Sequence, residues 1–166
     1  MYGQETDNFG IYNADSAPVL KHVELRVRSY NGKAYGLYND DSYVQVNDAD
    51  IIVYSYTTAQ SPSGNWTYGV FNHADSITYI RDSYIDALSI SPAGHWAVLN
   101  SSTGGKVIID HSHLRGSNSS LRNDNSQAYV ALGGSKIVGW VQGAVDCAAN
   151  YYETYFFYPD TCPTAP

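Results

Sequence analysis

The sequence predicts an all-β protein, a parallel β-helix (solenoid) in which about five three-stranded coils are stacked on one another. A short motif that ends in Asn recurs along the chain at spacings of 23 to 33 residues. Two segments with alternating apolar residues follow each copy, and insertions fall at one place in every repeat. The composition agrees, because 14% of the residues are aromatic, 14 are Gly and only 15% are charged. Such a composition favours strands and turns over helical bundles.

The first strand of each repeat carries the motif. Its copies are FGIYN at 9–13, YGLYN at 35–39, YGVFN at 68–72, WAVLN at 96–100 and SSLRN at 119–123. Strict alternation of period two predicts that Phe9 and Ile11 lie on one face of the strand and that Tyr12 lies on the other. Stacking then predicts that Leu37 lies next to Ile11 in a column that runs along the solenoid.

The Asn that closes each motif is predicted to form a corner of the coil. Asn tolerates a left-handed backbone, and its amide can hydrogen-bond to the coils above and below. The residues at this position are Asn13, Asn39, Asn72, Asn100 and Asn123.

The second and third strands of the repeats align in apolar columns. The second strands share the column Leu20, Val46, Ile80, Ile109 and Leu132, and the third strands share Leu25, Ile51, Ile85, Leu114 and Ile137. Insertions follow the third strand each time, whereas a hairpin sheet would need turn dipeptides such as Asn-Gly between its paired strands. Since one coil cannot bury its apolar face alone, neighbouring coils are expected to supply the core.

The repeats are expected to occupy residues 1–139, and residues 140–166 are expected to form an aromatic C-terminal cap. The two cysteines, Cys147 and Cys162, both lie in that cap. Two cysteines that close one short loop indicate a disulfide worth about 3 kcal/mol, with two free buried thiols as the alternative. A disulfide indicates an oxidising compartment, so the predicted location is extracellular or the cell surface.

The N-terminal end of the predicted solenoid has no covering segment. Open sheet edges aggregate unless they are covered. Residues 1–8 have the composition of a corner loop from a preceding coil. Either further coils precede this end, or the end stacks on another copy or another subunit.

The pattern xGVYNxxSxPxLxNVxI resembles the repeat of secreted bacterial right-handed parallel β-helix proteins of the pectin-lyase-like superfold. The segment YNADSAPVLKHVEL at 12–25 matches it best, and residues 133–163 are similar to the two-cysteine C-terminal end of that group. The resemblance implies a right-handed helix with a disulfide-stapled cap, an extracellular or cell-surface role and no set of catalytic residues. The usual Asn of the second strand is replaced by His22, Asp48, Asp82, His111 and Gly134.

Charge and motifs exclude several function classes. The net charge is −7 and the nine Lys and Arg residues are scattered, so we expect no nucleic-acid partner. No apolar run approaches the roughly 20 residues that span a bilayer. No phosphate-binding loop or zinc motif occurs, and we expect neither a cofactor nor a metal.

The replaced column is a candidate catalytic site, with Asp48 and Asp82 as the acids and His22 or His111 nearby. Stacking would place the two Asp residues about 5 Å apart at the backbone, and paired carboxylates at such a distance can perform retaining glycoside hydrolysis. Histidines beside carboxylates could also hold a divalent metal. The interpretation that we prefer is a solvated outward face.

Aromatic side chains form a candidate glycan-binding surface, because exposed rings on a rigid sheet can stack on sugars. The candidates are Tyr12, Tyr38, Phe71, Tyr54 and Trp66. The alternative is that these rings stack on one another and stabilise the coils.

The expected function is therefore that of an extracellular, non-enzymatic module for surface structure, adhesion or glycan recognition. Its partner would be a glycan, a cell surface or a second copy that stacks end to end on the open N-terminal coil. Two alternatives remain: a self-assembling filament subunit, and a carbohydrate-active enzyme (a glycosidase or lyase) that uses Asp48 and Asp82.

Overall fold

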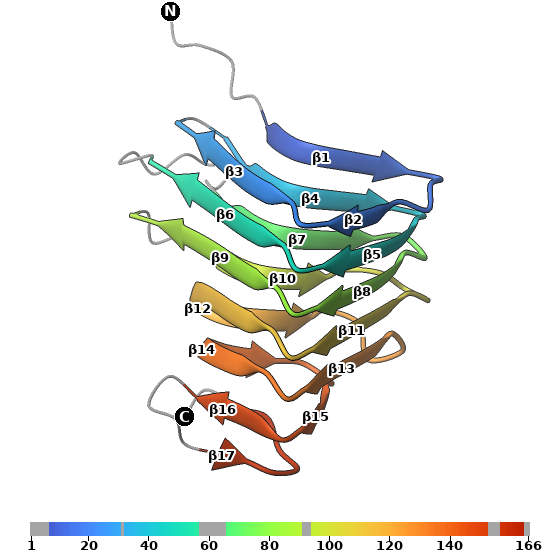
Figure 1. The fold of residues 1–166 in the computed structure, drawn as a ribbon, viewed down its shortest axis with the longest axis vertical. Coiled ribbons are helices and arrows are strands. Elements are labelled where there is room, and N and C mark those ends of the chain that lie inside the picture. The colour runs from blue at the N-terminus through green and yellow to red at the C-terminus, as the bar shows by residue number, and fades with distance from the viewer. Residues whose placement is uncertain (1–6, 31, 57–65, 91–93, 153–156, 165–166) are drawn as a thin grey trace, which may run out of the picture.

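The computed structural model describes residues 7–30, 32–56, 66–90, 94–152 and 157–164, and these residues form strands that recur in groups of three (Figure 1). The strands are β1 (Asn8–Ala14), β2 (Val19–Lys21), β3 (Glu24–Ser29), β4 (Ala34–Asp40), β5 (Tyr43–Asn47), β6 (Asp50–Ser55), β7 (Thr67–His73), β8 (Ile77–Arg81), β9 (Tyr84–Ser89), β10 (His95–Asn100), β11 (Lys106–Asp110), β12 (His113–Asn123), β13 (Tyr129–Gly133), β14 (Lys136–Gln142), β15 (Asp146–Ala148), β16 (Asn150–Tyr152) and β17 (Phe157–Tyr158). No helix in the described ranges is long and apolar enough to cross a membrane.

The strands pair in parallel with their counterparts in the next group. β2, β5, β8, β11, β13 and β15 form a 6-stranded sheet. An 11-stranded sheet contains the series β1, β4, β7, β10 and the series β3, β6, β9, and the long strand β12 joins the two series. The result is a nearly closed solenoid, so the predicted all-β fold of stacked parallel strands is confirmed (Figure 1).

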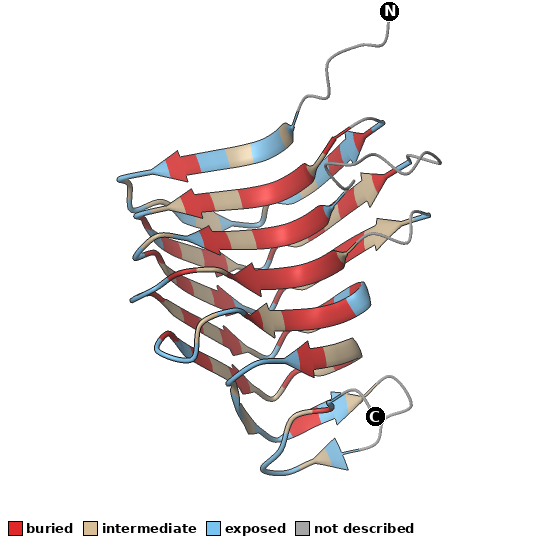
Figure 2. Ribbon diagram, turned by 180° about the vertical axis from the view of Figure 1, so that it is seen from behind, coloured by how far each residue is buried: buried red, intermediate tan, exposed pale blue. Residues whose placement is uncertain are grey.

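The predicted apolar columns form the core. Ile11 pairs with Leu37, Leu20 with Val46, and Leu25 with Ile51. From the second group of strands onward the members of these columns are almost completely buried, and Figure 2 shows them as red segments along each strand. Burial of each column depends on the coils on both sides of it, as expected for a solenoid.

The prediction that Phe9 and Ile11 share a face is wrong. Their counterparts separate in the second group, where Leu37 belongs to the core and Tyr35 belongs to an aromatic cluster outside it. Gly36 lies between them and also faces inward, because a Cβ there would approach Ile51 Cγ2 to 2.6 Å. Two consecutive inward-facing residues interrupt the alternation in the manner of a β-bulge.

The Asn residues form the predicted ladder. Asn13 Nδ2 donates to Asn39 Oδ1 at 2.9 Å, and Asn100 accepts from Asn72 and donates to Asn123, each at 3.0 Å. Between Asn39 and Asn72 the Thr78 hydroxyl relays the chain of hydrogen bonds.

The expectation that these Asn residues adopt a left-handed backbone is wrong. Positive φ angles occur two residues later, at Asp15, Asp41 and Ala74. The Asn residues are held in strand register, since Asn13 pairs with Asn39 and Asn39 with Asn72. This register keeps their amides buried within the ladder, so the backbone turns only after the strand has ended.

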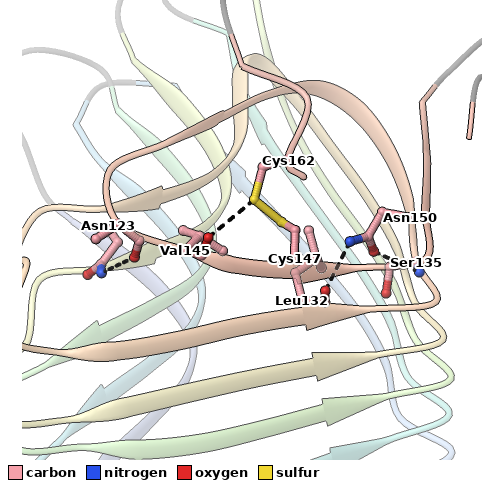
Figure 3. Close-up of a disulfide and its surroundings, with 8 residues drawn as sticks. Asn123, Leu132, Ser135, Val145, Cys147, Asn150 and Cys162 are labelled. Carbon is pink, nitrogen blue, oxygen red and sulfur yellow. Dashed lines mark hydrogen bonds between the residues drawn. A yellow bond between two sulfur atoms is a disulfide. The ribbon is translucent and has the colours of Figure 1, made fainter. Parts of the chain in front are cut away.

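The C-terminal segment covers the last group of strands. The Cys147–Cys162 disulfide is present, with 5.3 Å between the Cα atoms, and Val145 packs against the core with both cysteines (Figure 3). Asn150 accepts a hydrogen bond from Ser135 N and donates one to Leu132 O. β14 continues across the expected boundary at residue 139, so strand pairing extends into the cap.

Candidate functional site

The column of residues that stand where the family pattern has Asn forms a row with left-handed backbone. It lies at the bend between the second and third strands of each group. The φ angles are 53° at His22, 52° at Asp48, 50° at Asp82, 46° at His111 and 55° at Gly134. Asp and His tolerate this region better than most residues, and Gly has no steric penalty. The column that the sequence predicted therefore stacks as expected, and the identity of its residues follows partly from the backbone.

A groove follows this bend. One cavity of about 630 Å³ is lined by residues that include His111, His113 and Lys136, and a second of about 470 Å³ is lined by residues that include Glu24 and Asp50. Both are open depressions that share Asp82 and Tyr84, so they lie side by side along the bend, and we call them together the bend groove. Its polar and aromatic lining residues are His22, Glu24, Asp48, Asp50, Asp82, Ser83, Tyr84, His111, Ser112, His113, Lys136 and Tyr151.

Buried serines hold the groove wall in place. Ser83 Oγ accepts from Ala49 N at 3.1 Å, and Ser112 and Ser135 repeat this contact in the following groups. Each of these hydroxyls also donates to a carbonyl of its own bend, as Ser83 does to Arg81 O at 2.7 Å. The bend therefore has a fixed shape from one coil to the next.

The N-terminal half of the groove is acidic and its charges are largely paired. His22 Nδ1 lies 2.7 Å from Asp48 Oδ2, and both side chains are more than two-thirds exposed. Arg26 contacts Glu24 at 2.7 Å and Asp50 at 3.2 Å. Exposed pairs of this kind contribute little energy and are typical of a solvated face.

The predicted catalytic carboxylates lie in this region. Asp48 is bonded to His22, and Asp82 occupies the next position of the column, exposed and shared by both cavities. His111 is one group further along and contacts Asp110 at 2.9 Å. The column brings all four predicted residues to one groove. Asp48, however, makes its polar contact with His22 and not with a second carboxylate, as a catalytic pair of acids would require.

The C-terminal half of the groove has one acid, Asp82, and one base, Lys136, beside the half-buried side chains of His113 and Tyr84. His113 packs edge-on against the Tyr84 ring, with 4.9 Å between ring centroids. Burial, with Lys136 and Arg115 nearby, lowers the pKa of His113, so its ring is neutral at physiological pH. Its Nε2 atom is buried and has no hydrogen-bond partner among the described residues.

Sequence reasoning missed Asp86, which faces outward beside the groove and yet is only 3% exposed. The Tyr84 hydroxyl donates to Asp86 Oδ2 at 2.9 Å, and Arg115 Nη1 lies 3.6 Å from the same oxygen. Burial raises the pKa of Asp86. The sequence did contain a signal for this pair. In the alignment of the third strands Asp86 lies in register with Arg115, and a basic neighbour in register indicates a paired carboxylate.

The predicted glycan-binding column of Tyr12, Tyr38 and Phe71 is a ring ladder. Its centroids are 5.1 and 5.0 Å apart, and the rings are stacked. A second ladder of Phe9, Tyr35, Tyr68 and Trp96 lies beside it. Ring faces in such a ladder cover one another, so sugars would meet mainly ring edges. The stabilising role is therefore the better interpretation of this column.

The other two predicted aromatic residues lie elsewhere. Tyr54 is stacked near Tyr56 at 6.0 Å on the outer side of β6, and Trp66 is in a corner with the ammonium of Lys33 5.4 Å from its ring. The structure therefore does not bring the five predicted aromatic residues together. Further exposed rings that the sequence reasoning missed lie on the outer face of the 6-stranded sheet, at Tyr43 and Tyr129.

No group of three or more His, Cys, Asp and Glu side chains suited to a metal ion occurs within the described ranges. Comparison with protein-family models, curated proteins and solved structures gave no match.

Proposed function

We propose that this chain is an extracellular, non-enzymatic module of the right-handed, pectin-lyase-like β-helix type that recognises an extended glycan in the bend groove. The observation that carries the proposal is a pair of unsatisfied polar atoms in the groove wall. Asp50 Oδ1 and His113 Nε2 are buried and have no hydrogen-bond partner among the described residues. Each such group costs about 1–3 kcal/mol. Neither atom is open to the groove as the side chains lie, so a ligand hydroxyl would remove that cost only once the side chain has turned toward it.

The spacing of these atoms suits a chain of sugars. Asp50 pairs in register with Tyr84, and Tyr84 with His113, so the two unsatisfied groups lie on strands two positions apart. Parallel strands are about 4.8 Å apart, which gives a separation of roughly 10 Å along the groove. The Tyr84 ring lies between them and offers an apolar surface with a polar edge.

The enzyme alternative has less support. Asp48 is paired with His22 on the exposed surface, and within the described part of the chain no side-chain contact joins the Asp82 carboxylate to a second acid. The disulfide in the cap is compatible with an oxidising compartment and supports the extracellular assignment.

Glycan-array screening followed by calorimetry tests the proposal. We expect Tyr84→Ala and His113→Ala each to weaken binding at least tenfold, about 1.4 kcal/mol. Tyr43→Ala, on the outer face of the other sheet, is the matched control and should leave the affinity unchanged. If Tyr43→Ala loses as much affinity as the groove variants, or if neither groove substitution changes the affinity, then the groove is not the binding site. Turnover of a bound polysaccharide that Asp82→Asn abolishes would favour the enzyme instead.

A further inference from the structure

The outer face of the 6-stranded sheet is uncovered among the described residues. The strands of this sheet make their main contacts with one another, and Figure 1 shows them stacked from β2 to β15. The inward residues Val44 and Val46 are completely buried, whereas Tyr43 and Tyr129 are 42% and 48% exposed on the other side. Val19 adds an aliphatic side chain that is also exposed. We call the surface formed by the outward residues of this sheet the sheet face.

The sheet face is regular. The strands β5, β8, β11 and β13 each have five residues and pair one to one, whereas the pairing of β12 with β14 contains two register shifts. The outward side chains therefore lie in three straight columns. These are Tyr43, Ile77, Lys106 and Tyr129; Val19, Gln45, Tyr79, Ile108 and Ala131; and Lys21, Asn47, Arg81, Asp110 and Gly133.

Two open depressions follow one another across this face. Their volumes are about 280 and 320 Å³, and they share Ile108 and Asp110, so they lie side by side along the stacking direction. Tyr43 and Tyr79 line the first, and Tyr129 lines the second. Tyr43 and Tyr129 are three strands apart in one column, which separates them by about 14 Å. A ligand that touches both rings must therefore be a polymer or another extended surface.

The charges in the middle of the sheet face are already engaged. Arg81 Nη2 lies 3.2 Å from Asp110 Oδ2. The ammonium of Lys106 lies 5.8 and 5.3 Å from the centroids of two tyrosine rings. The other two charged residues, Lys21 and Asp146, belong to β2 and β15, the outermost strands of the sheet. Because burial of an unpaired charge is costly, this distribution favours an uncharged partner.

The size of the face distinguishes a polysaccharide from a protein partner. Five residues span about 16 Å and six strands about 24 Å, so the face covers roughly 400 Å². A stable protein pair buries about 800 Å² on each partner, which is twice as much. Sugars have apolar ring faces and polar edges, so tyrosine rings can stack on them while the amides of Gln45 and Asn47 hydrogen-bond to their hydroxyls.

We propose that the sheet face binds the flat surface of an insoluble, uncharged polysaccharide, in which sugar chains lie side by side. This site goes beyond the single glycan chain proposed for the bend groove, and no residue that lines the groove belongs to the sheet face. The module would use the sheet face to anchor itself on the packed polymer. Cellulose and chitin both present such a surface, so the test has an arm for each.

Sedimentation of the full chain with cellulose powder and with chitin powder tests the proposal. We expect the wild type to sediment with at least one of them. The double variant Tyr43→Ala, Tyr129→Ala should bind at least about tenfold more weakly, because it lacks two ring contacts. Ala131→Lys should also weaken binding, since it raises a charged side chain above the middle column without removing a ring. Tyr30→Ala, at an exposed tyrosine outside this sheet, is the control and should bind like the wild type.

Three results would overturn the proposal. The first is a wild type that sediments with neither powder, or a double variant that is folded by circular dichroism and binds unchanged. The second is loss of sedimentation in Tyr84→Ala with unchanged binding of the sheet-face variants, which would place the polymer in the bend groove and support the proposed function alone. The third is a mass twice the 18.2 kDa of one chain in light scattering that the double variant halves, which would make the face an interface between copies.

Discussion

At the scale of single residues, the bends depend on positions with φ near 50°, and the side chains there differ in how well they tolerate it. Ala74 has a φ of 49° and no polar side chain to stabilise this backbone. An L-residue in the left-handed region costs about 1–2 kcal/mol, a cost that Gly does not have.

Ala74→Gly is therefore expected to increase the free energy of unfolding by about 1 kcal/mol, offset in part by the added flexibility of the unfolded chain. Ala131→Gly, on the extended strand β13, is the control and should lower it by roughly 0.5–1 kcal/mol. Urea denaturation measures both. If the two substitutions destabilise equally, the left-handed backbone at Ala74 does not limit stability.

Asp86 gives a prediction of the pH dependence. Its pKa is raised by burial, so the folded protein binds a proton that the unfolded chain has released at the same pH. The contribution of Asp86 to stability therefore falls as the pH rises from the ordinary Asp pKa of about 3.9 through the raised value.

Asp86→Asn should remove this fall, because the amide oxygen still accepts from Tyr84 and nothing ionises at residue 86. Between pH 3.5 and 7 the unfolding midpoint of Asp86→Asn should change less with pH than the midpoint of the wild type. Asp146→Asn, at an exposed position, should keep the wild-type profile. A variant whose midpoint follows the wild type at every pH would mean that Asp86 does not titrate in this range.

At the scale of strands, columns could be predicted from the sequence because like residues stack on like residues, as Leu25, Ile51 and Ile85 do. Alternation failed where Gly36 allows two residues to face inward, since a residue without a side chain carries no apolar signal. The groove could not be predicted because it depends on the angle of a bend and not on the order of residues. The burial of Asp86 depends on side chains contributed by different strands, among them Tyr84 and Arg115.

The cap offers a test at the same scale. The disulfide joins cysteines 15 residues apart, and removing a loop constraint of that size costs about 3 kcal/mol. In a solenoid each coil contacts only its neighbours, so the loss should be local. The double variant Cys147→Ser, Cys162→Ser should lower hydrogen-exchange protection in β13, β14 and β16 and leave β4 and β5 unchanged. A uniform loss of protection over all strands would show instead that the molecule unfolds as one unit.

For the whole molecule, stability should depend on where along the solenoid a contact lies. Leu25 and Leu114 occupy the same column, but Leu25 is only partly buried in β3 and Leu114 is fully buried in β12. Leu114→Ala should cost about 2–5 kcal/mol, because it removes buried methyl groups and leaves a cavity. Leu25→Ala should cost less than half as much, since part of that side chain is already in water.

Urea denaturation of the wild type and both variants measures this difference. If Leu25→Ala costs as much as Leu114→Ala, then Leu25 is as fully packed in solution as Leu114, and position along the solenoid does not decide the cost of a core substitution.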